Sequence, residues 1–213
     1  MTGPTKVKIC GITSPEDAAV AVAAGADALG FNFYRKSPRY IDPGVAKQIV
    51  ASLPPFITSV GVFVNEELTT VRSIMDTCGL AIAQLHGDEP ATYCRELSRP
   101  VIKALRLKDR GSFLALTEFE GRAGVRGFLV DSFSETAYGG TGQVTDWDLA
   151  AEAAKAATIV LAGGLTPANV AEAIRIVRPY GVDVSSGVES VPGKKDHRKV
   201  RAFLDAVRVV SST

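Results

Sequence analysis

The stretch that decides the fold is KVKICGITSPEDAAVAVAAGADALGFNF, residues 6–33. The short β-branched run at 7–12 predicts a strand, and the alanine-rich run at 15–24 predicts a helix that Gly25 closes. A second apolar run at 28–33 predicts another strand. Two strands joined through a helix are typical of a parallel sheet, so this segment predicts one strand–helix–strand unit.

The same alternation of strands and helices repeats along the chain. Further strands are expected at 57–64, 81–85, 101–105, 127–131, 158–162 and 182–185, and further helices at 43–52, 66–77, 90–97, 112–119, 147–156, 167–177 and 196–209. The run at 159–162 is apolar throughout, which is typical of strands covered on both faces. Eight strand–helix units favour a closed barrel over an open sheet. We therefore expect an α/β fold, a single-domain TIM (β/α)8 barrel spanning residues 1–213.

The composition is that of an ordinary globular protein. Of the 213 residues, 46% are hydrophobic and 22% are charged, and a net charge of +1 gives no electrostatic footprint for nucleic acid. The sequence has no uninterrupted apolar run that would span a membrane, and its N-terminus lacks the apolar stretch of a signal peptide. Its three cysteines have no pairing pattern, which argues against a disulfide framework. We expect a cytoplasmic protein without nucleic-acid or membrane partners.

The loops that follow strands carry glycines, polar residues and titratable residues, so we expect function on that side of the barrel. Glycines let a backbone approach a phosphate closely, and in TIM barrels the loops after strands seven and eight are the common phosphate site. The same glycines could simply close turns, but two such loops at these two units favour anion binding. The candidate phosphate ligands are Gly163, Gly164, Ser185, Ser186 and Gly187, with Gly140 and Gly142 after the sixth strand as possible additions.

Two strands end on a proton-transfer group. Cys10 ends the first strand and Asp131 ends the sixth, and the C-terminal ends of barrel strands meet on one face. A thiol and a carboxylate facing one pocket suit a general base and a general acid. Cys10 precedes a helix N-terminus, a setting that predicts a lowered thiol pKa. The structural alternatives are a small buried cysteine and a loop or capping aspartate.

Three further side chains are candidates for the pocket. Arg39 could grip a planar carboxylate through two hydrogen bonds, although a surface arginine is the plainer interpretation. Gln84 and His86 end the fourth strand and could line the same pocket. The sequence has no cluster with metal-ligand spacing and no dinucleotide fingerprint after the first strand, so we expect neither a metal nor a cofactor.

Seven longer motifs follow one another in the chain: VKICGIT (7–13), GVFVN (61–65), QLHG (84–87), YGGTG (138–142), LAGGLTPANV (161–170), DVSSGVE (183–189) and PGKKD (192–196). Together they strongly resemble the phosphoribosylanthranilate isomerase family of tryptophan biosynthesis, over residues 7–207. The family is a small TIM barrel that acts on a phosphoribosyl substrate without a cofactor. Many of its members are monomers, so a monomer is expected here rather than a dimer.

The resemblance implies an Amadori rearrangement of N-(5-phosphoribosyl)anthranilate to 1-(2-carboxyphenylamino)-1-deoxyribulose 5-phosphate. It implies that Asp131 protonates the ring oxygen and that Cys10, as thiolate, removes the proton from C2. Arg39 matches the family's ligand for the anthranilate carboxylate, and Gly164 with the loop at 185–187 matches its phosphate site. Asp183 is carried over as a ligand of the sugar hydroxyls.

Two other functions fit parts of the same sequence. The related phosphoribosyl-aminoimidazole isomerase of histidine biosynthesis would be expected to carry an aspartate where Cys10 stands. A non-catalytic phosphosugar-binding barrel would keep the phosphate loops and would have no need of both Cys10 and Asp131.

Overall fold

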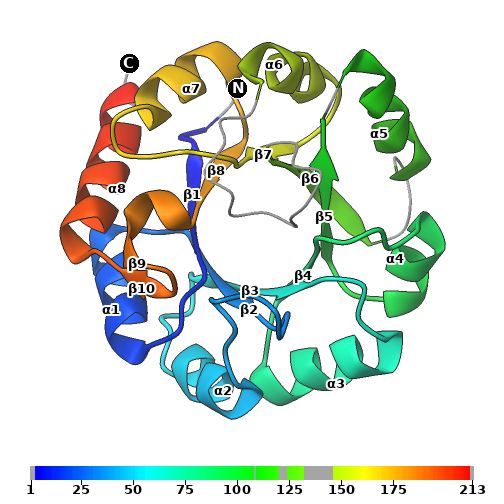
Figure 1. Ribbon diagram of the computed structural model, residues 1–213, viewed down its shortest axis with the longest axis vertical. Helices are drawn as coiled ribbons and strands as arrows, with labels where there is room; N and C mark the ends of the chain where they lie inside the picture. The colour runs from blue at the N-terminus through cyan, green and yellow to red at the C-terminus, as the bar shows by residue number, and fades with distance from the viewer. Residues whose placement is uncertain (1–2, 108, 120–123, 132–145, 212–213) are drawn as a thin grey trace.

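The computed structural model describes residues 3–107, 109–119, 124–131 and 146–211, and within these ranges eight parallel strands close into a barrel inside a ring of helices (Figure 1). The strands are β1 (Lys6–Cys10), β2 (Ala28–Asn32), β3 (Thr58–Phe63), β4 (Ile82–Leu85), β5 (Val101–Arg106), β6 (Val125–Asp131), β7 (Ile159–Leu161) and β8 (Gly181–Val184). Each strand pairs with its neighbour in the chain, and β1 closes the barrel on β8. The predicted TIM barrel is confirmed.

The helices that cover the barrel lie where the sequence predicts them, apart from shifts at their ends. They are α1 (Pro15–Ala24), α2 (Pro43–Ala51), α3 (Leu68–Cys78), α4 (Ala91–Leu97), α5 (Phe113–Phe119), α6 (Trp147–Ala156), α7 (Val170–Val177) and α8 (His197–Ser211). Local signals fix their ends. The Ser14 side chain accepts a hydrogen bond from the Asp17 amide at the start of α1, and Gly25 ends that helix at a φ of 95°.

The start of α7 differs from the sequence-based prediction, which placed it at residue 167. The helix begins at Val170 because Asn169 holds the preceding residues in a turn. The Asn169 side chain accepts a hydrogen bond from the Thr166 amide at 2.7 Å and donates one to the Gly164 carbonyl at 3.0 Å. The residues before the helix therefore shape the loop that follows β7.

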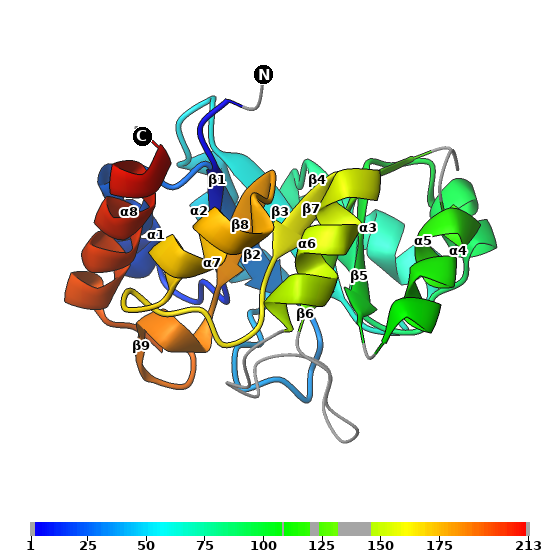
Figure 2. The ribbon, with the colours of Figure 1, turned by 90° about the horizontal axis from the view of Figure 1, so that it is seen from above.

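A short hairpin was not predicted. It consists of β9 (Glu189–Val191) and β10 (Lys194–Lys195), and it follows the 3-10 helix η2 (Ser186–Val188). The hairpin and the loop after β2 project from the same end of the barrel (Figure 2). Thr13 donates a hydrogen bond to the Gly193 carbonyl at 2.6 Å, and the Lys195 amide donates one to Asp17 at 3.0 Å. These bonds tie the hairpin to the loop after β1 and to the first turn of α1. A further 3-10 helix, η1 (Arg110–Ser112), precedes α5.

The core has two parts because side chains alternate along each strand. One set, which includes Ile9, Leu29 and Leu161, is fully buried in the larger cluster between the strands and the helices. Each such side chain contributes roughly 1.5–3 kcal/mol when it is removed from water. The other set points into the barrel, where Ala104, Leu129 and Ala162 form a separate small cluster. The barrel interior is thus filled by side chains below the strand ends.

None of the helices within the described residues combines the length and the apolar character needed to cross a lipid bilayer.

Candidate active site

Cys10 ends β1, and its side chain is almost buried, with 8% of the residue exposed. Its partner in the sheet register is Gly30 on β2. A Cβ atom at Gly30 would lie 2.8 Å from the Cys10 Sγ atom and 3.0 Å from the Lys8 Nζ atom, so only glycine leaves room for both side chains. The thiol therefore occupies a space made by the neighbouring strand.

The charges around Cys10 come from three strands. Lys8 on β1 forms an ion pair with Asp183 on β8, with Nζ and Oδ1 2.8 Å apart, and Lys195 approaches from β10. Burial raises the pKa of the Cys10 thiol above its ordinary value, while the positive charges of Lys8 and Lys195 pull it down and Asp183 adds to the rise. The prediction of a lowered thiol pKa is wrong for this structure, because the effect of burial on the pKa outweighs that of both ammonium groups.

Asp131 ends β6 and is 5% exposed. The Nε2 atom of His86 lies 3.3 Å from its Oδ2 atom, and the Nε2 amide of Gln84 lies 2.9 Å from Nδ1 of the same ring. The Nδ1 atom of the ring faces the Gln84 amide group, and its Nε2 atom faces Asp131. Gln84, His86 and Asp131 therefore form one chain of contacts across three strand ends.

Arg39 lies in the loop after β2 and is held by Glu189 at the start of β9. The guanidinium Nε and Nη2 atoms each lie 2.8 Å from one carboxylate oxygen of Glu189, and Lys195 Nζ lies 2.9 Å from the Oε1 atom. Burial opposes the negative charge, but the hydrogen bonds and charges of Arg39 and Lys195 hold the pKa of Glu189 below its ordinary value. The three groups sum to one positive charge, which fits a negatively charged ligand.

The stem of Arg39 covers the end of β1. A Cβ atom at Gly11 would lie 2.7 Å from Cδ of Arg39 and 3.1 Å from Oγ of Ser185, and Gly11 has a φ of +74°. Arg39 and Ser185 therefore lie against the residue that follows Cys10. The guanidinium offers its Nη1 side to a ligand, since Glu189 holds only Nε and Nη2 in the described part of the chain.

The two loops predicted to bind phosphate lie against each other. Gly163 and Gly164 have φ values of 83° and 63°, and a Cβ atom at Gly187 would overlap the carbonyl oxygen of Leu165. Ser186 begins the 3-10 helix η2. The Oγ atom of Ser185 is buried and has no hydrogen-bond partner among the described residues, so it can accept or donate a bond to a ligand. The candidates Gly140 and Gly142 lie outside the described residues.

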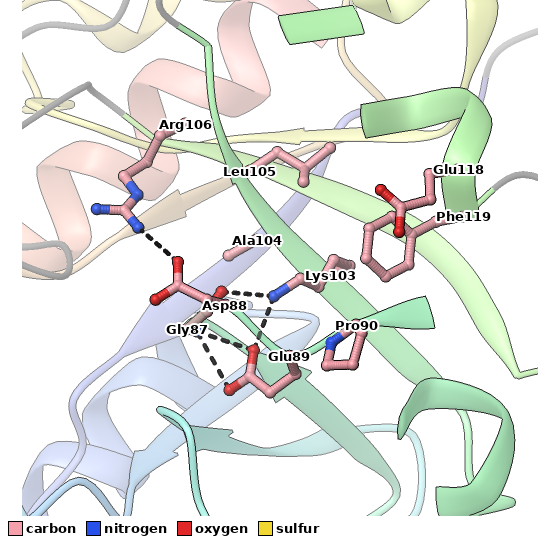
Figure 3. A pocket seen from close by; sticks show the side chains of 10 residues that line it. All are labelled: Gly87, Asp88, Glu89, Pro90, Lys103, Ala104, Leu105, Arg106, Glu118 and Phe119. Atoms are coloured by element: carbon pink, nitrogen blue, oxygen red, sulfur yellow. Dashed lines mark hydrogen bonds and ion pairs between the residues drawn. The ribbon is translucent and has the colours of Figure 1, made fainter. Parts of the chain in front are cut away.

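A second set of charged side chains braces the loop that carries His86 (Figure 3). Glu89 accepts hydrogen bonds from the backbone amides of Asn65 and Gly87 at 2.7 and 3.0 Å. Lys103 on β5 donates to Glu89 at 2.7 Å and to the Gly87 carbonyl at 2.6 Å. These groups line part of a cavity of about 630 Å³ and tie the ends of β3, β4 and β5 together. The network therefore holds Gly87, the residue that directly follows His86.

Lys8, Glu189 and Lys195 were not identified from the sequence. Charged residues in a strand and a short charged run are usually exposed, whereas Lys8 is 5% and Lys195 2% exposed. A usable signal was present at Lys8, since it shares the inward face of β1 with Cys10 under strand alternation. Lys195 and Glu189 could not be placed because the hairpin that carries them was not predicted.

The described residues contain no group of three or more histidine, cysteine, aspartate or glutamate side chains that could hold a metal ion. The groups that the site does offer are a thiol, a carboxylate, an arginine and two glycine-rich loops. This set can exchange protons and bind anions.

Comparison with known proteins identifies the family. The model of the family described as N-(5′-phosphoribosyl)anthranilate (PRA) isomerase matches residues 7–206. An N-(5′-phosphoribosyl)anthranilate isomerase of Pelobacter propionicus is 55% identical over 199 residues, which are 93% of each chain. The solved phosphoribosyl anthranilate isomerase of Thermotoga maritima is 41% identical with a TM-score of 0.89, and the match covers 96% of this chain and 99% of that one.

A solved phosphoribosyl anthranilate isomerase in complex with reduced 1-(o-carboxyphenylamino)-1-deoxyribulose 5-phosphate is also 41% identical. Its TM-score is 0.85, and the match covers 96% of this chain and 99% of that chain. The barrel, the proton-transfer groups at its strand ends and these matches lead to one conclusion: this chain belongs to the N-(5′-phosphoribosyl)anthranilate isomerase family.

Proposed function

We propose that Cys10 and Asp131 are the general base and the general acid with which this isomerase of tryptophan biosynthesis acts on N-(5-phosphoribosyl)anthranilate. The observation that carries the proposal is their placement: both end strands of one barrel, and both are nearly buried. The product is 1-(2-carboxyphenylamino)-1-deoxyribulose 5-phosphate. The reaction moves two electrons within the sugar, from C2 to C1, so it needs no redox cofactor.

The first step opens the ribose ring. Asp131, in its protonated form, gives its proton to the ring oxygen while the bond between C1 and that oxygen breaks. The lone pair of the anthranilate nitrogen forms a double bond to C1, which leaves a protonated imine. The His86 ring contacts Asp131 through Nε2 and keeps the carboxyl group in place during this transfer.

The second step moves a proton from carbon. The Cys10 thiolate takes the proton from C2, and the electrons of that bond form a double bond between C1 and C2 as the nitrogen regains its lone pair. The resulting enolamine becomes the ketone when C1 gains a proton and the C2 hydroxyl loses one. Cys10 gains one proton and Asp131 gives one, so the overall change is an isomerisation.

The remaining candidates bind the substrate. Arg39 binds the anthranilate carboxylate through the part of its guanidinium that Glu189 leaves open, and the loops after β7 and β8 bind the phosphate. Asp183 binds sugar hydroxyls next to Cys10. Gly140 and Gly142 complete the phosphate cradle in this proposal.

The test follows the loss of substrate fluorescence, with substrate generated in place, for wild type, Cys10→Ser and Asp131→Asn. Each variant is expected to lose at least about 10²-fold in kcat/KM. Cys94→Ala and Asp27→Asn are matched controls that alter a buried cysteine and an aspartate away from the C-terminal ends of the strands, and both should keep kcat. Turnover that survives in both site variants would overturn the assignment of base and acid.

The assembly and location of the chain are part of the proposal. We infer that residues 1–213 act as one domain and as a monomer in the cytoplasm. The reason for the monomer is that Cys10, Asp131 and both phosphate loops come from a single chain. Phe56, which is 93% exposed, is the feature that a dimer would be expected to cover. Sedimentation equilibrium decides, and a stable dimer at working concentrations would overturn the monomer.

A further inference from the structure

Lys8 is a charged side chain inside the barrel for which the mechanism above has no use. It lies two residues before Cys10 on the same face of β1, and its side chain is 6% exposed. An ammonium group in this setting has lost most of its contact with water, which is costly unless nearby groups compensate. A hydrophobic residue would fill the interior without that cost. The buried charge therefore indicates that Lys8 has a role in the chemistry of the site.

The ammonium of Lys8 lies between a carboxylate and the catalytic sulfur. Its Nζ atom is 2.8 Å from Oδ1 of Asp183, the residue opposite Lys8 in the sheet register. On its other side, the Lys8 ammonium approaches the Cys10 sulfur. A Cβ atom at Gly30 would lie 3.0 Å from Nζ and 2.8 Å from Sγ, so both atoms border the same small space. Despite burial, the charges of Asp183 and Cys10 hold the pKa of Lys8 above its ordinary value, so the ammonium stays charged.

The charged groups that face Cys10 sum to one positive charge. Lys8 comes from β1, Asp183 from β8 and Lys195 from β10, while β2 presents only Gly30 at this point. Lys195 is also bound to Glu189, whereas Lys8 exerts the larger pull on the thiol. A thiolate at Cys10 would make the set of four neutral. The neutral thiol leaves a buried excess of positive charge.

We propose that Lys8 is a positioning residue whose ammonium stabilises the thiolate form of Cys10. The inference rests on the proposed function in one respect, namely that Cys10 is the base. In this proposal Lys8 acts through Cys10 and not on the substrate itself. It offsets the burial that otherwise keeps the sulfur protonated, and it holds the sulfur against the space left by Gly30.

A purely structural role would give Lys8 only the task of neutralising Asp183. The two roles predict different thiol acidities for a pair of variants. Lys8→Met leaves Asp183 buried and unpaired, whereas Lys8→Met combined with Asp183→Asn removes both charges and leaves no unpaired ion. If Lys8 only neutralises Asp183, the double variant recovers the thiol acidity of wild type. If Lys8 stabilises the thiolate, the double variant stays less acidic.

The experiment titrates the ultraviolet absorbance of the Cys10 thiolate against pH. For each protein the matched Cys10→Ser variant is subtracted, which removes the contributions of Cys78, Cys94 and the tyrosines. Lys8→Met should titrate at least about one pH unit above wild type, a tenfold loss of thiolate at neutral pH. Lys8→Arg should stay close to wild type, and the double variant should lie between wild type and Lys8→Met.

An unchanged titration in Lys8→Met, or a double variant at or below the wild-type value, would overturn the proposal. If Lys8→Met does not fold, the double variant and Lys8→Arg decide the question alone. The titration is independent of turnover, so a wild-type enzyme without isomerase activity would overturn the proposed function and leave this measurement intact. Where turnover is present, the alkaline shift should reappear in kcat/KM against pH.

Discussion

Glu189 holds Arg39 through both carboxylate oxygens, with Nε–Oε1 and Nη2–Oε2 distances of 2.8 Å. The same carboxylate binds Lys195, so two cations share one anion next to the end of β1. Planar pairs of this kind restrict the orientation of a guanidinium more than a single contact does. Arg39 is therefore aimed before any substrate arrives.

Glu189→Gln should raise KM for N-(5-phosphoribosyl)anthranilate about tenfold with little change in kcat, because Arg39 contacts a part of the substrate that does not react. The substitution removes the negative charge that holds Arg39 in its orientation. Steady-state kinetics check the prediction, with Glu96→Gln as a surface control. A fall in kcat at constant KM would contradict it.

The same pair predicts how stability depends on pH. The pKa of Glu189 is lowered in the folded state, so this carboxylate adds stability above its ordinary pKa and the contribution disappears as pH falls through the folded value. Wild type should therefore lose stability on acidification more steeply than Glu189→Gln does. Urea unfolding at a series of acidic pH values measures the difference. Parallel curves for the two proteins would show that Glu189 contributes nothing to acid sensitivity.

Gly30→Ala should lower kcat strongly and the free energy of unfolding only slightly. The added methyl group would meet the Cys10 Sγ atom at 2.8 Å and push the thiol from its place, so kcat should fall by about 10²-fold. Gly127→Ala is the matched control, because its methyl group would meet the Thr158 carbonyl at 2.9 Å on a different strand. That variant should lose stability and keep the kcat of the folded fraction. Equal kcat values in the two variants would contradict the assignment.

Breaking the Lys103–Glu89 pair should destabilise the barrel. Both side chains are less than 5% exposed, and Lys103→Met would leave Glu89 as a buried carboxylate without its cation, at a cost of about 3–5 kcal/mol. Lys6→Met is the matched control, because the Lys6–Asp27 pair is exposed and should contribute at most about 1 kcal/mol. Urea unfolding of both variants gives the comparison. Similar losses would argue against a buried, charged Glu89.

The pH profile of the enzyme should report the titration of Cys10 on its alkaline side. Burial raises the pKa of Cys10, so the fraction of thiolate in the free enzyme increases up to alkaline pH, whereas the proposed reaction also needs Asp131 in its protonated form. The value of kcat/KM should therefore pass through a maximum, and the titration of Cys10 should set its alkaline limb. In the substrate complex the protonated imine places a positive charge near the sulfur and favours the thiolate. The alkaline limb of kcat should therefore lie at lower pH than that of kcat/KM. Coincident limbs would contradict this effect of the imine.

Much of the fold follows from local patterns in the sequence. The strand–helix alternation placed all eight strands and helices of the described barrel, because each unit has its own apolar period and its own end signals. The start of α7 was missed because the Asn169 side chain bonds to residues on both sides of a turn, and propensity does not express such bonds. The hairpin after η2 was missed because its strands are short and anchored by Thr13 and Asp17, far away in the chain.

The site was predicted less completely. Strand ends identified Cys10, Asp131 and the two glycine loops, since a parallel barrel brings such ends together regardless of sequence distance. Burial could not be predicted, and burial decides the thiol pKa and turns Lys8 and Lys195 from apparent surface charges into neighbours of Cys10. The contact of His86 with Asp131 depends on the relative positions of β4 and β6, which no local pattern specifies.

The pairing of β1 with β8 has a consequence for how the enzyme is made. Cys10 leaves the ribosome 173 residues before Asp183, the partner of Lys8. A nascent chain therefore carries a reactive thiol and a lysine without the strand that orders them. The barrel cannot become active by degrees during translation. Catalysis begins only when β8 pairs with β1.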